Sequence, residues 1–226
     1  MKVVEIFQSV QGEGRFIGHL MTFVRLFGCN LRCKYCDSEY SWKGPHYSDM
    51  SVADVVRHVR MYDNRWVCIT GGEPLVQKRE LGSLINQLLA REYKVLVETN
   101  GSLPIWEVYR YRDVLWDVDV KGPSSGEEGS FLKENLRYIN PPDYLKFVVG
   151  SEGDYKFLVD FLKWLSNSED YHYVDIVVQP EGSLPTERVT GILERLKDEK
   201  LPERIRTHVR FLPQWHRILY GSKRGV

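Results

Sequence analysis

The chain has 226 residues, and 31 Lys and Arg balance 31 Asp and Glu, so the formal net charge is zero. This balance excludes a general nucleic-acid-binding protein, which neutralises phosphates with an excess of basic side chains. No apolar run approaches the ~20 residues that span a bilayer, and the first residues lack the apolar segment of a secretory signal. We therefore expect a cytoplasmic globular protein that folds as a single domain over residues 1–226.

Short runs rich in Val, Ile, Tyr and Phe alternate with helical patterns along the chain. The predicted strands are Leu20–Leu26, Trp66–Thr70, Lys94–Glu98, Val114–Val120, Tyr144–Val149, Tyr173–Gln179 and His208–Leu212. Apolar residues at helical spacing predict helices around residues 81–89, 157–165 and 189–196, and Ser51 with Asp54 indicates a capped helix start. Such repetition predicts parallel strands joined by right-handed crossovers. About six β/α units predict a partial, open TIM-like barrel, because a closed eightfold barrel typically takes ~250 residues.

Polar and glycine-containing segments follow several of the predicted strands. In parallel α/β folds, functional residues gather at the carboxyl ends of the strands. The segments at these ends are the cysteine loop, Thr70–Pro74, Glu98–Gly101, Lys121–Ser124 and Gln179–Gly182. We therefore expect one site that is built from these loops.

Three of the four cysteines lie close together in a loop predicted over residues 27–40. Cys29, Cys33 and Cys36 have the spacing C-x-x-x-C-x-x-C, whereas Cys68 stands alone in a predicted strand. A disulfide framework would spread its cysteines, and closed structural zinc needs four ligands. We expect Cys68 to be a small buried apolar residue. An iron–sulfur cube usually takes four cysteines, so three would leave one iron open for a chelating cofactor.

The cysteine spacing, with an aromatic Tyr35 before the last cysteine, resembles the signature of radical S-adenosylmethionine (SAM) enzymes. The resemblance implies a radical SAM core in which Cys29, Cys33 and Cys36 hold a [4Fe–4S] cluster whose open iron binds SAM. Reduction would then cleave SAM to a 5′-deoxyadenosyl radical. Gly71-Gly72-Glu73-Pro74 is similar to the segment that positions the SAM amino group in that family. Implied cofactor contacts, the last three from their strand-end position alone, are Tyr35, Cys36, Asp37, Gly72, Glu73, Lys121, Ser124 and Gln179.

The segments around this signature resemble the 7-carboxy-7-deazaguanine synthase family of queuosine (7-deazapurine) biosynthesis. They are residues 5–14, 22–29, 36–38, 97–102, 119–125 and 212–216. The resemblance implies a carbon–nitrogen lyase that converts 6-carboxy-5,6,7,8-tetrahydropterin to 7-carboxy-7-deazaguanine with loss of ammonia. It also implies Mg²⁺, a homodimer, and an external one-electron reductant such as flavodoxin.

The same resemblance implies a set of substrate contacts. Glu13 suits the N–H groups of an aminopyrimidine edge, and Gln11 offers both a donor and an acceptor. Arg25 interrupts an apolar strand, so its guanidinium is expected either on a substrate carboxylate or in an internal ion pair. Ser38 is the expected Mg²⁺ ligand, at a position where the family often has threonine. The full set of implied substrate contacts is Val10, Gln11, Gly12, Glu13, Arg25, Thr70 and His216.

Two other interpretations stay open at this point. A glycyl-radical activating enzyme shares the cysteine signature, but it requires a large protein partner instead of a pterin. A non-enzymatic metal-binding module would neither bind SAM nor release 5′-deoxyadenosine on reduction.

Overall fold

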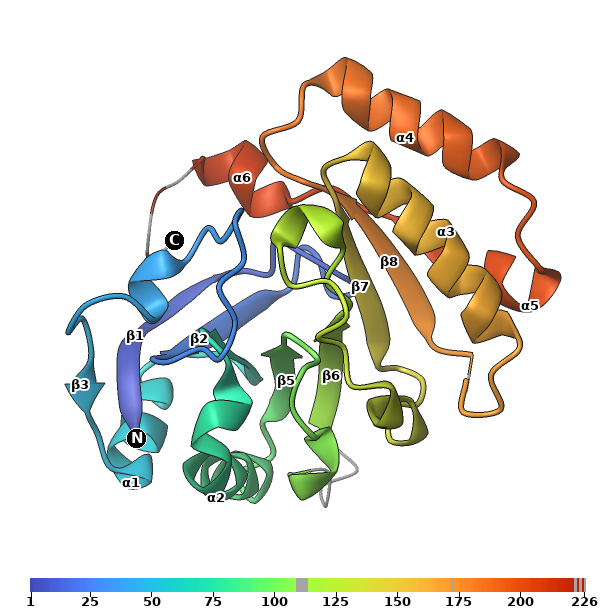
Figure 1. The fold of residues 1–226 in the computed structure, drawn as a ribbon. Coiled ribbons are helices and arrows are strands. Elements are labelled where there is room, and N and C mark those ends of the chain that lie inside the picture. Colours follow the sequence, from blue (N-terminus) through green and yellow to red (C-terminus); the bar gives the residue numbers. More distant parts are fainter. Residues whose placement is uncertain (109–113, 172, 222, 224, 226) are drawn as a thin grey trace.

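The computed structural model describes residues 1–226 except 109–113, 172, 222, 224 and 226, and it contains a nine-stranded sheet in the described part (Figure 1). The strand order is β3-β1-β2-β4-β5-β6-β7-β8-β9. The strands are β1 (Lys2–Val10), β2 (Leu20–Leu26), β3 (Ser48–Asp49), β4 (Trp66–Gly71), β5 (Lys94–Thr99), β6 (Val114–Asp119), β7 (Tyr144–Val149), β8 (Asp175–Pro180) and β9 (Val209–Phe211). From β2 onward in that order, neighbouring strands pair in parallel. The sheet does not close, so the predicted open, partial barrel is confirmed.

Strand β1 was not predicted from the sequence. It pairs antiparallel with β2 and with the short strand β3 at the edge of the sheet. Its residues alternate irregularly between apolar and polar types, and most of them are only half-buried. Neither face of β1 is completely covered. Such a strand does not need the mostly apolar run that identifies the parallel strands.

The helices are α1 (Val52–Val59), α2 (Lys78–Leu89), α3 (Glu152–Ser166), α4 (Thr186–Asp198), α5 (Glu203–Arg206) and α6 (Trp215–Tyr220). Helices α1 to α5 lie on the outer, convex side of the curved sheet, whereas α6 lies at the carboxyl ends of the strands (Figure 1). Ser51 caps α1 in a reciprocal capping box with Asp54, as predicted. The crossovers from β5 to β6 and from β6 to β7 contain only short 3-10 helices among their described residues.

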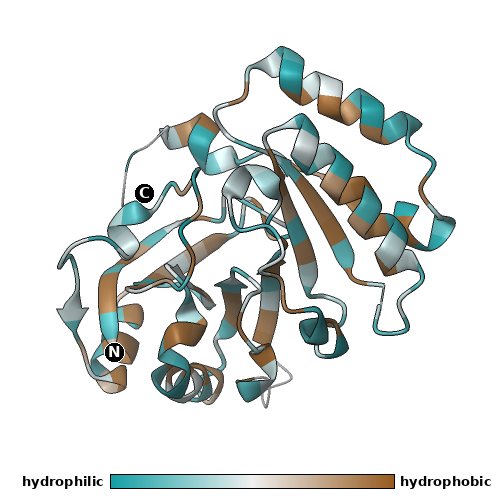
Figure 2. Ribbon diagram, in the orientation of Figure 1, coloured by the Kyte–Doolittle hydropathy of each residue, from teal (hydrophilic) through white to brown (hydrophobic). Residues whose placement is uncertain are grey.

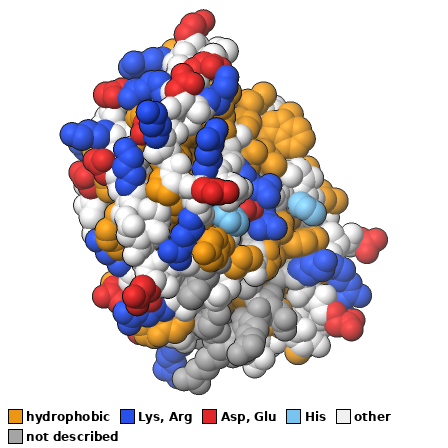
Figure 3. Space-filling view, turned by 90° about the vertical axis from the view of Figure 1, so that its right-hand side faces the viewer, with side chains coloured by type: hydrophobic (Ala, Val, Ile, Leu, Met, Phe, Trp, Pro, Cys, Tyr) orange, Lys and Arg blue, Asp and Glu red, His pale blue; other side chains and the backbone are white. Residues whose placement is uncertain are grey.

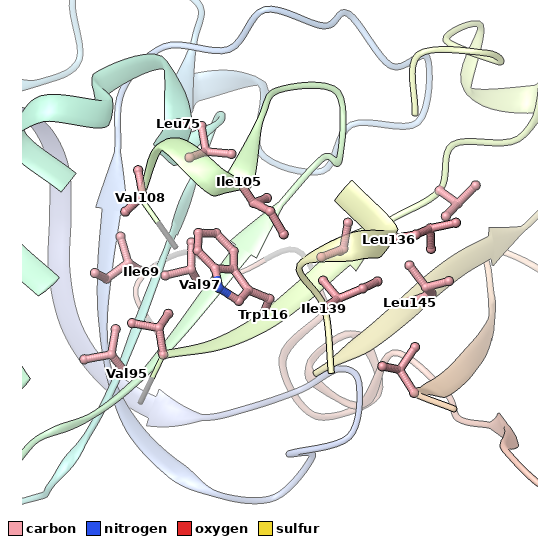
Figure 4. Close-up of a cluster of buried hydrophobic side chains, with 14 of the residues drawn as sticks. Ile69, Leu75, Val95, Val97, Ile105, Val108, Trp116, Leu136, Ile139 and Leu145 are labelled. Atoms are coloured by element: carbon pink, nitrogen blue, oxygen red, sulfur yellow. The ribbon is translucent and has the colours of Figure 1, made fainter. Parts of the chain in front are cut away.

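The main core fills the space between these helices and the sheet. Brown, apolar ribbon marks the strands and the inward helix faces in Figure 2. Trp116 on β6 is fully buried, and Figure 4 places it among Val97, Ile105 and Ile139. Burial of this continuous apolar surface supplies the main driving force for folding.

The surface carries mixed charge. On the face shown in Figure 3, Lys and Arg side chains lie among Asp and Glu side chains instead of forming a field of one sign. No helix in the described part of the chain is both long and apolar enough to cross a membrane.

The inner, concave side of the sheet has two layers, because successive side chains on a strand alternate between faces. The inner apolar layer lies toward the amino ends and contains Met21, Phe23, Cys68, Leu96, Tyr144 and Val177. Cys68 is thus the buried apolar residue that we expected. Two residues further along five of these strands lies the inner polar layer, which consists of Arg25, Thr70, Glu98, Lys146 and Gln179. The polar layer faces the carboxyl ends of the strands, where the site is expected.

Candidate active site

A cavity of about 610 Å³ opens above the inner polar layer at the carboxyl ends of the strands. The structure brings most of the predicted site residues together in its wall. Those that line it are Val10, Gln11, Gly12, Glu13, Arg25, Cys29, Cys33, Tyr35, Cys36, Asp37, Ser38, Thr70, Gly72, Lys121 and His216. Segments from both ends of the chain therefore meet the cysteine loop at one place.

Two adjacent glycines hold the cysteine loop against the end of β4. A Cβ atom on Gly72 would lie 2.2 Å from the carbonyl oxygen of Gly28, and one on Gly71 would lie 2.2 Å from that of Leu26. These close approaches allow the Gly72 N–H to donate to Leu26 and the Glu73 N–H to donate to Gly28, at 3.1 and 2.7 Å. A side chain at Gly72 would push the cysteine loop away from the sheet, and one at Gly71 would push apart the ends of β2 and β4.

The cysteine sulfurs face hydrogen-bond donors. The Leu31 N–H donates to Cys29 Sγ at 3.4 Å, and Asn100 Nδ2 lies 3.7 Å from the same sulfur. Trp42 Nε1 donates to Cys36 Sγ at 3.5 Å. Donors of this kind stabilise thiolate ligands and tune the reduction potential of an iron–sulfur cluster.

The cysteine sulfurs are not gathered around a single point. Among the described residues, only Glu13, Asp37 and His216 bring three His, Cys, Asp or Glu ligand atoms within 4.8 Å of one another. The three cysteine sulfurs therefore do not have the close arrangement of ligands around one zinc ion, with Zn–S bonds of about 2.3 Å.

The thiols of Cys29 and Cys33 favour their protonated forms in the absence of metal. Burial is the main cause that raises the pKa of Cys29 and raises that of Cys33 to about 11, and neighbouring cysteines contribute to both shifts. A bound metal ion would reverse this preference, because it stabilises the thiolate that coordinates it.

Three of the predicted cofactor contacts lie outside the residues that line the cavity: Glu73, Ser124 and Gln179. The Glu73 carboxylate is fully buried and accepts bonds from the Leu75 and Asn100 N–H groups and from Thr99 Oγ1, at 2.7–3.0 Å. It ties the end of β4 to the end of β5. Ser124 donates its N–H to Asp154, and Gln179 is buried at the end of β8, beside Glu13.

The loop after β1 (the N-terminal loop), which carries Gly12 and Glu13, packs against a segment near the C-terminus. The Trp215 N–H donates to the Gly12 carbonyl at 2.7 Å, and Gln214 Nε2 donates to Glu13 Oε1 at 2.8 Å. A Cβ atom on Gly12 would lie 2.5 Å from Cβ of His216, so only glycine fits there. Residues 214–216 therefore form part of the cavity wall.

A hydrogen-bonded network joins Gln11 to the inner polar layer. Gln11 Nε2 donates to Glu98 Oε1 at 2.8 Å, and Thr70 Oγ1 donates to Glu98 Oε2 at 2.6 Å. The side-chain carbonyl of Gln11 accepts the Glu13 N–H at 3.1 Å. Arg25 forms the internal ion pair that was one of its two predicted roles, since its Nε lies 2.8 Å from Glu5 Oε1. The guanidinium also lines the cavity, so a substrate contact there stays a prediction.

His216 lies between two carboxylates. Its Nδ1 is 3.7 Å from Glu13 and its Nε2 is 3.6 Å from Asp37. Burial alone would lower the pKa of His216, but the two carboxylates outweigh burial and raise it. A protonated imidazole would link the N-terminal loop to the cysteine loop.

Several site residues were missed in the sequence. Lys146, Asp119, Trp42 and Gln214 all line the cavity, and Asp117 lies buried beneath it. One signal was available: Asp117 and Asp119 are two positions apart on a strand, so both face the same side. Charged residues that share the inner face of a buried strand indicate a polar site.

The chain is similar to known proteins over most of its length. A model of the radical SAM superfamily matches residues 24–167. A 7-carboxy-7-deazaguanine synthase from Thermoplasma acidophilum is 35% identical over 226 residues, which is all of both chains. One from Koribacter versatilis is 46% identical over 164 residues, or 72% of this chain and 71% of the relative. The crystal structure of QueE from Escherichia coli has the same fold, with a TM-score of 0.74 at 23% identity, covering 95% of this chain and 94% of QueE.

Proposed function

The chain belongs to the 7-carboxy-7-deazaguanine synthase family of the radical SAM superfamily, and from this membership we propose that it converts 6-carboxy-5,6,7,8-tetrahydropterin to 7-carboxy-7-deazaguanine with loss of ammonia. The observation that carries the proposal is the meeting of the cysteine loop and the inner polar layer in one cavity. The cysteine loop offers sulfur ligands on one side of the cavity, and the inner polar layer offers hydrogen-bonding groups for a polar heterocycle on the other.

Superfamily membership implies SAM and a [4Fe–4S] cluster. Cys29, Cys33 and Cys36 would hold the cluster, and its open iron would bind SAM. When bound, the cluster and SAM supply the one-electron chemistry that abstracts hydrogen from the substrate. The backbone at Gly72 lies against the cysteine loop, where it can receive the SAM amino group. Glu73 would contribute indirectly, because its hydrogen bond from the Asn100 N–H holds this turn in place.

The chain's own residues bind and orient the pterin. Glu13 accepts from the aminopyrimidine N–H groups, and the network of Gln11, Glu98 and Thr70 fixes the loop that carries Glu13. Arg25 lies on the same wall and suits the substrate carboxylate.

The experiment is anaerobic reconstitution with iron and sulfide, followed by reductant, SAM and the carboxypterin. We expect 7-carboxy-7-deazaguanine, with dithionite or reduced flavodoxin as the electron source. SAM cleavage that ignores the pterin but responds to a protein partner would instead favour a glycyl-radical activating enzyme. A preparation that binds metal without cleaving SAM would favour a metal-binding module.

We further propose that Ser38 supplies one Mg²⁺ ligand, because its hydroxyl lines the cavity beside the cluster loop, 3.9 Å from Cys36 Sγ. Mg²⁺ often needs only one or two protein oxygens in addition to substrate oxygens and water. Ser38→Ala should reduce the stimulation by Mg²⁺ several-fold, whereas Ser38→Thr, which keeps the hydroxyl, should retain it. An unchanged magnesium response in Ser38→Ala would contradict the assignment.

We also propose a homodimer. Support comes from apolar side chains exposed on α6 and at the start of β2, where Ile218 is 69% exposed and Leu20 is 50% exposed. Sedimentation velocity of the reconstituted protein tests this.

A further inference from the structure

Both oxygens of the Glu13 carboxylate are held by other side chains. Oε2 lies 3.0 Å from Lys146 Nζ, and Oε1 accepts from Gln214 Nε2 at 2.8 Å. His216 Nδ1 lies 3.7 Å from Oε1. The orientation of Glu13 is thus set before any ligand enters.

Lys146 is buried, and two carboxylates of β6 hold its ammonium group. Its side chain is 6% exposed, and Nζ lies 2.9 Å from Asp117 Oδ2 and 3.5 Å from Asp119 Oδ1. Asp119 is the register partner of Lys146 across β6 and β7, so the sheet itself places these groups together. A buried ammonium persists only where such partners repay its loss of hydration.

We propose that Lys146 is a positioning residue for substrate binding: anchored by Asp117 and Asp119, it holds Glu13 as an oriented carboxylate toward the N–H groups of the pterin. This inference rests on the proposed function. An ionised carboxylate only accepts hydrogen bonds, whereas a protonated one also presents a donor against the substrate's own donors. Lys146 therefore favours the form of Glu13 that only accepts hydrogen bonds.

The charges around Glu13 support this role. Burial alone would raise the pKa of Glu13, but Lys146 and His216 outweigh burial and hold it well below its ordinary value. Burial would lower the pKa of Lys146, and the surrounding carboxylates raise it instead. The charged groups that face this pair are Asp37, Glu98, Asp117, Asp119 and His216. Of these groups and Lys146, the two cations Lys146 and His216 favour the ionised form of Glu13.

The test compares Lys146→Met with the double variant Lys146→Met/Asp117→Asn. Lys146→Met leaves Asp117 buried without its partner and should lower the thermal midpoint. The double variant removes both members of that pair, so the midpoint should recover while Glu13 still lacks its cation. We expect both variants to raise KM and the equilibrium Kd for the carboxypterin roughly 30-fold. Should Lys146→Met fail to fold, the double variant carries the test.

A pH profile separates positioning from a structural role. Without Lys146 the pKa of Glu13 rises, so KM of the double variant, which also lacks the Asp117 carboxylate, should increase more steeply on acidification than KM of the wild type. The control is Lys163→Met on α3, where the lysine is half-exposed and pairs with Glu199 on the outer surface; its KM should match the wild type.

Two outcomes overturn the inference, and they differ. If the wild type turns over the carboxypterin but the double variant has wild-type KM and pH profile, Lys146 is only structural. If the wild type makes no 7-carboxy-7-deazaguanine, the proposed function fails and this inference fails with it.

Discussion

The inner apolar layer and the inner polar layer lie on the same strands and on the same face of the sheet, two residues apart. On β5, for example, Leu96 belongs to the apolar layer and Glu98 to the polar layer. The apolar layer packs against itself and closes the barrel interior from below. The polar layer holds charges that are expensive to bury and that only partly satisfy one another. Position along the strand therefore separates the residues that stabilise the fold from those that bind ligands.

The first test, where we expect the largest change, compares the cysteine loop, which borders the cavity together with the polar layer, with the inner apolar layer. Cys33→Ala should abolish 5′-deoxyadenosine formation, since a cluster with two protein ligands is not held in place. Cys68→Ala should leave the cluster and turnover intact and reduce the free energy of unfolding by only about 1 kcal/mol, as for a small buried truncation. Iron content, 5′-deoxyadenosine release and urea denaturation measure both variants. A Cys68→Ala protein that fails to assemble the cluster would break the comparison.

A second pair of variants tests the two layers on a single strand. Leu96→Ala should lower the free energy of unfolding by about 3 kcal/mol, because it opens a cavity in the apolar layer. Glu98→Gln should cost less stability, about 1 kcal/mol, but raise KM for the carboxypterin about tenfold, because the new amide faces the donors of Gln11 and Thr70. If Leu96→Ala and Glu98→Gln lowered the free energy of unfolding equally and raised KM equally, the two layers would not have separate roles.

The sequence predicted the parallel strands and the cysteine loop because their signals are local. A run that is apolar at every position but one, such as Tyr144–Val149 with Lys146 inside it, identifies a buried strand, and β7 has those bounds. The capping box at Ser51 is likewise contained within four residues. The cysteine spacing needs no tertiary information, because all three cluster ligands come from one short loop.

The sequence could not predict the contacts that the fold creates between distant segments. Lys146 meets Glu13 across 133 positions, and Gln214 meets it across 201. Glu73 illustrates the reverse case, since its motif indicates a cofactor contact while its carboxylate is used by Thr99 and Asn100. Which neighbours a side chain has depends on strand order and register, and these are settled only by the complete sheet.

A third test concerns Glu73, a carboxylate at the polar end that is buried as deeply as the apolar layer. Burial raises its pKa from 4.5 to about 7, although three donors oppose the shift. The folded state thus binds this proton more tightly than the unfolded state, so stability from this group is present below pH 4.5 and is lost as pH rises through 7.

Glu73→Gln removes that titration while keeping the size of the side chain. Between pH 5 and pH 7.5 the wild type should lose about 2 kcal/mol of unfolding free energy relative to the variant. Urea denaturation of both proteins across this range measures the difference, and every other titrating group is common to the two. Parallel stability curves would show that Glu73 is ionised at both pH values, and that its three donors compensate fully for its burial.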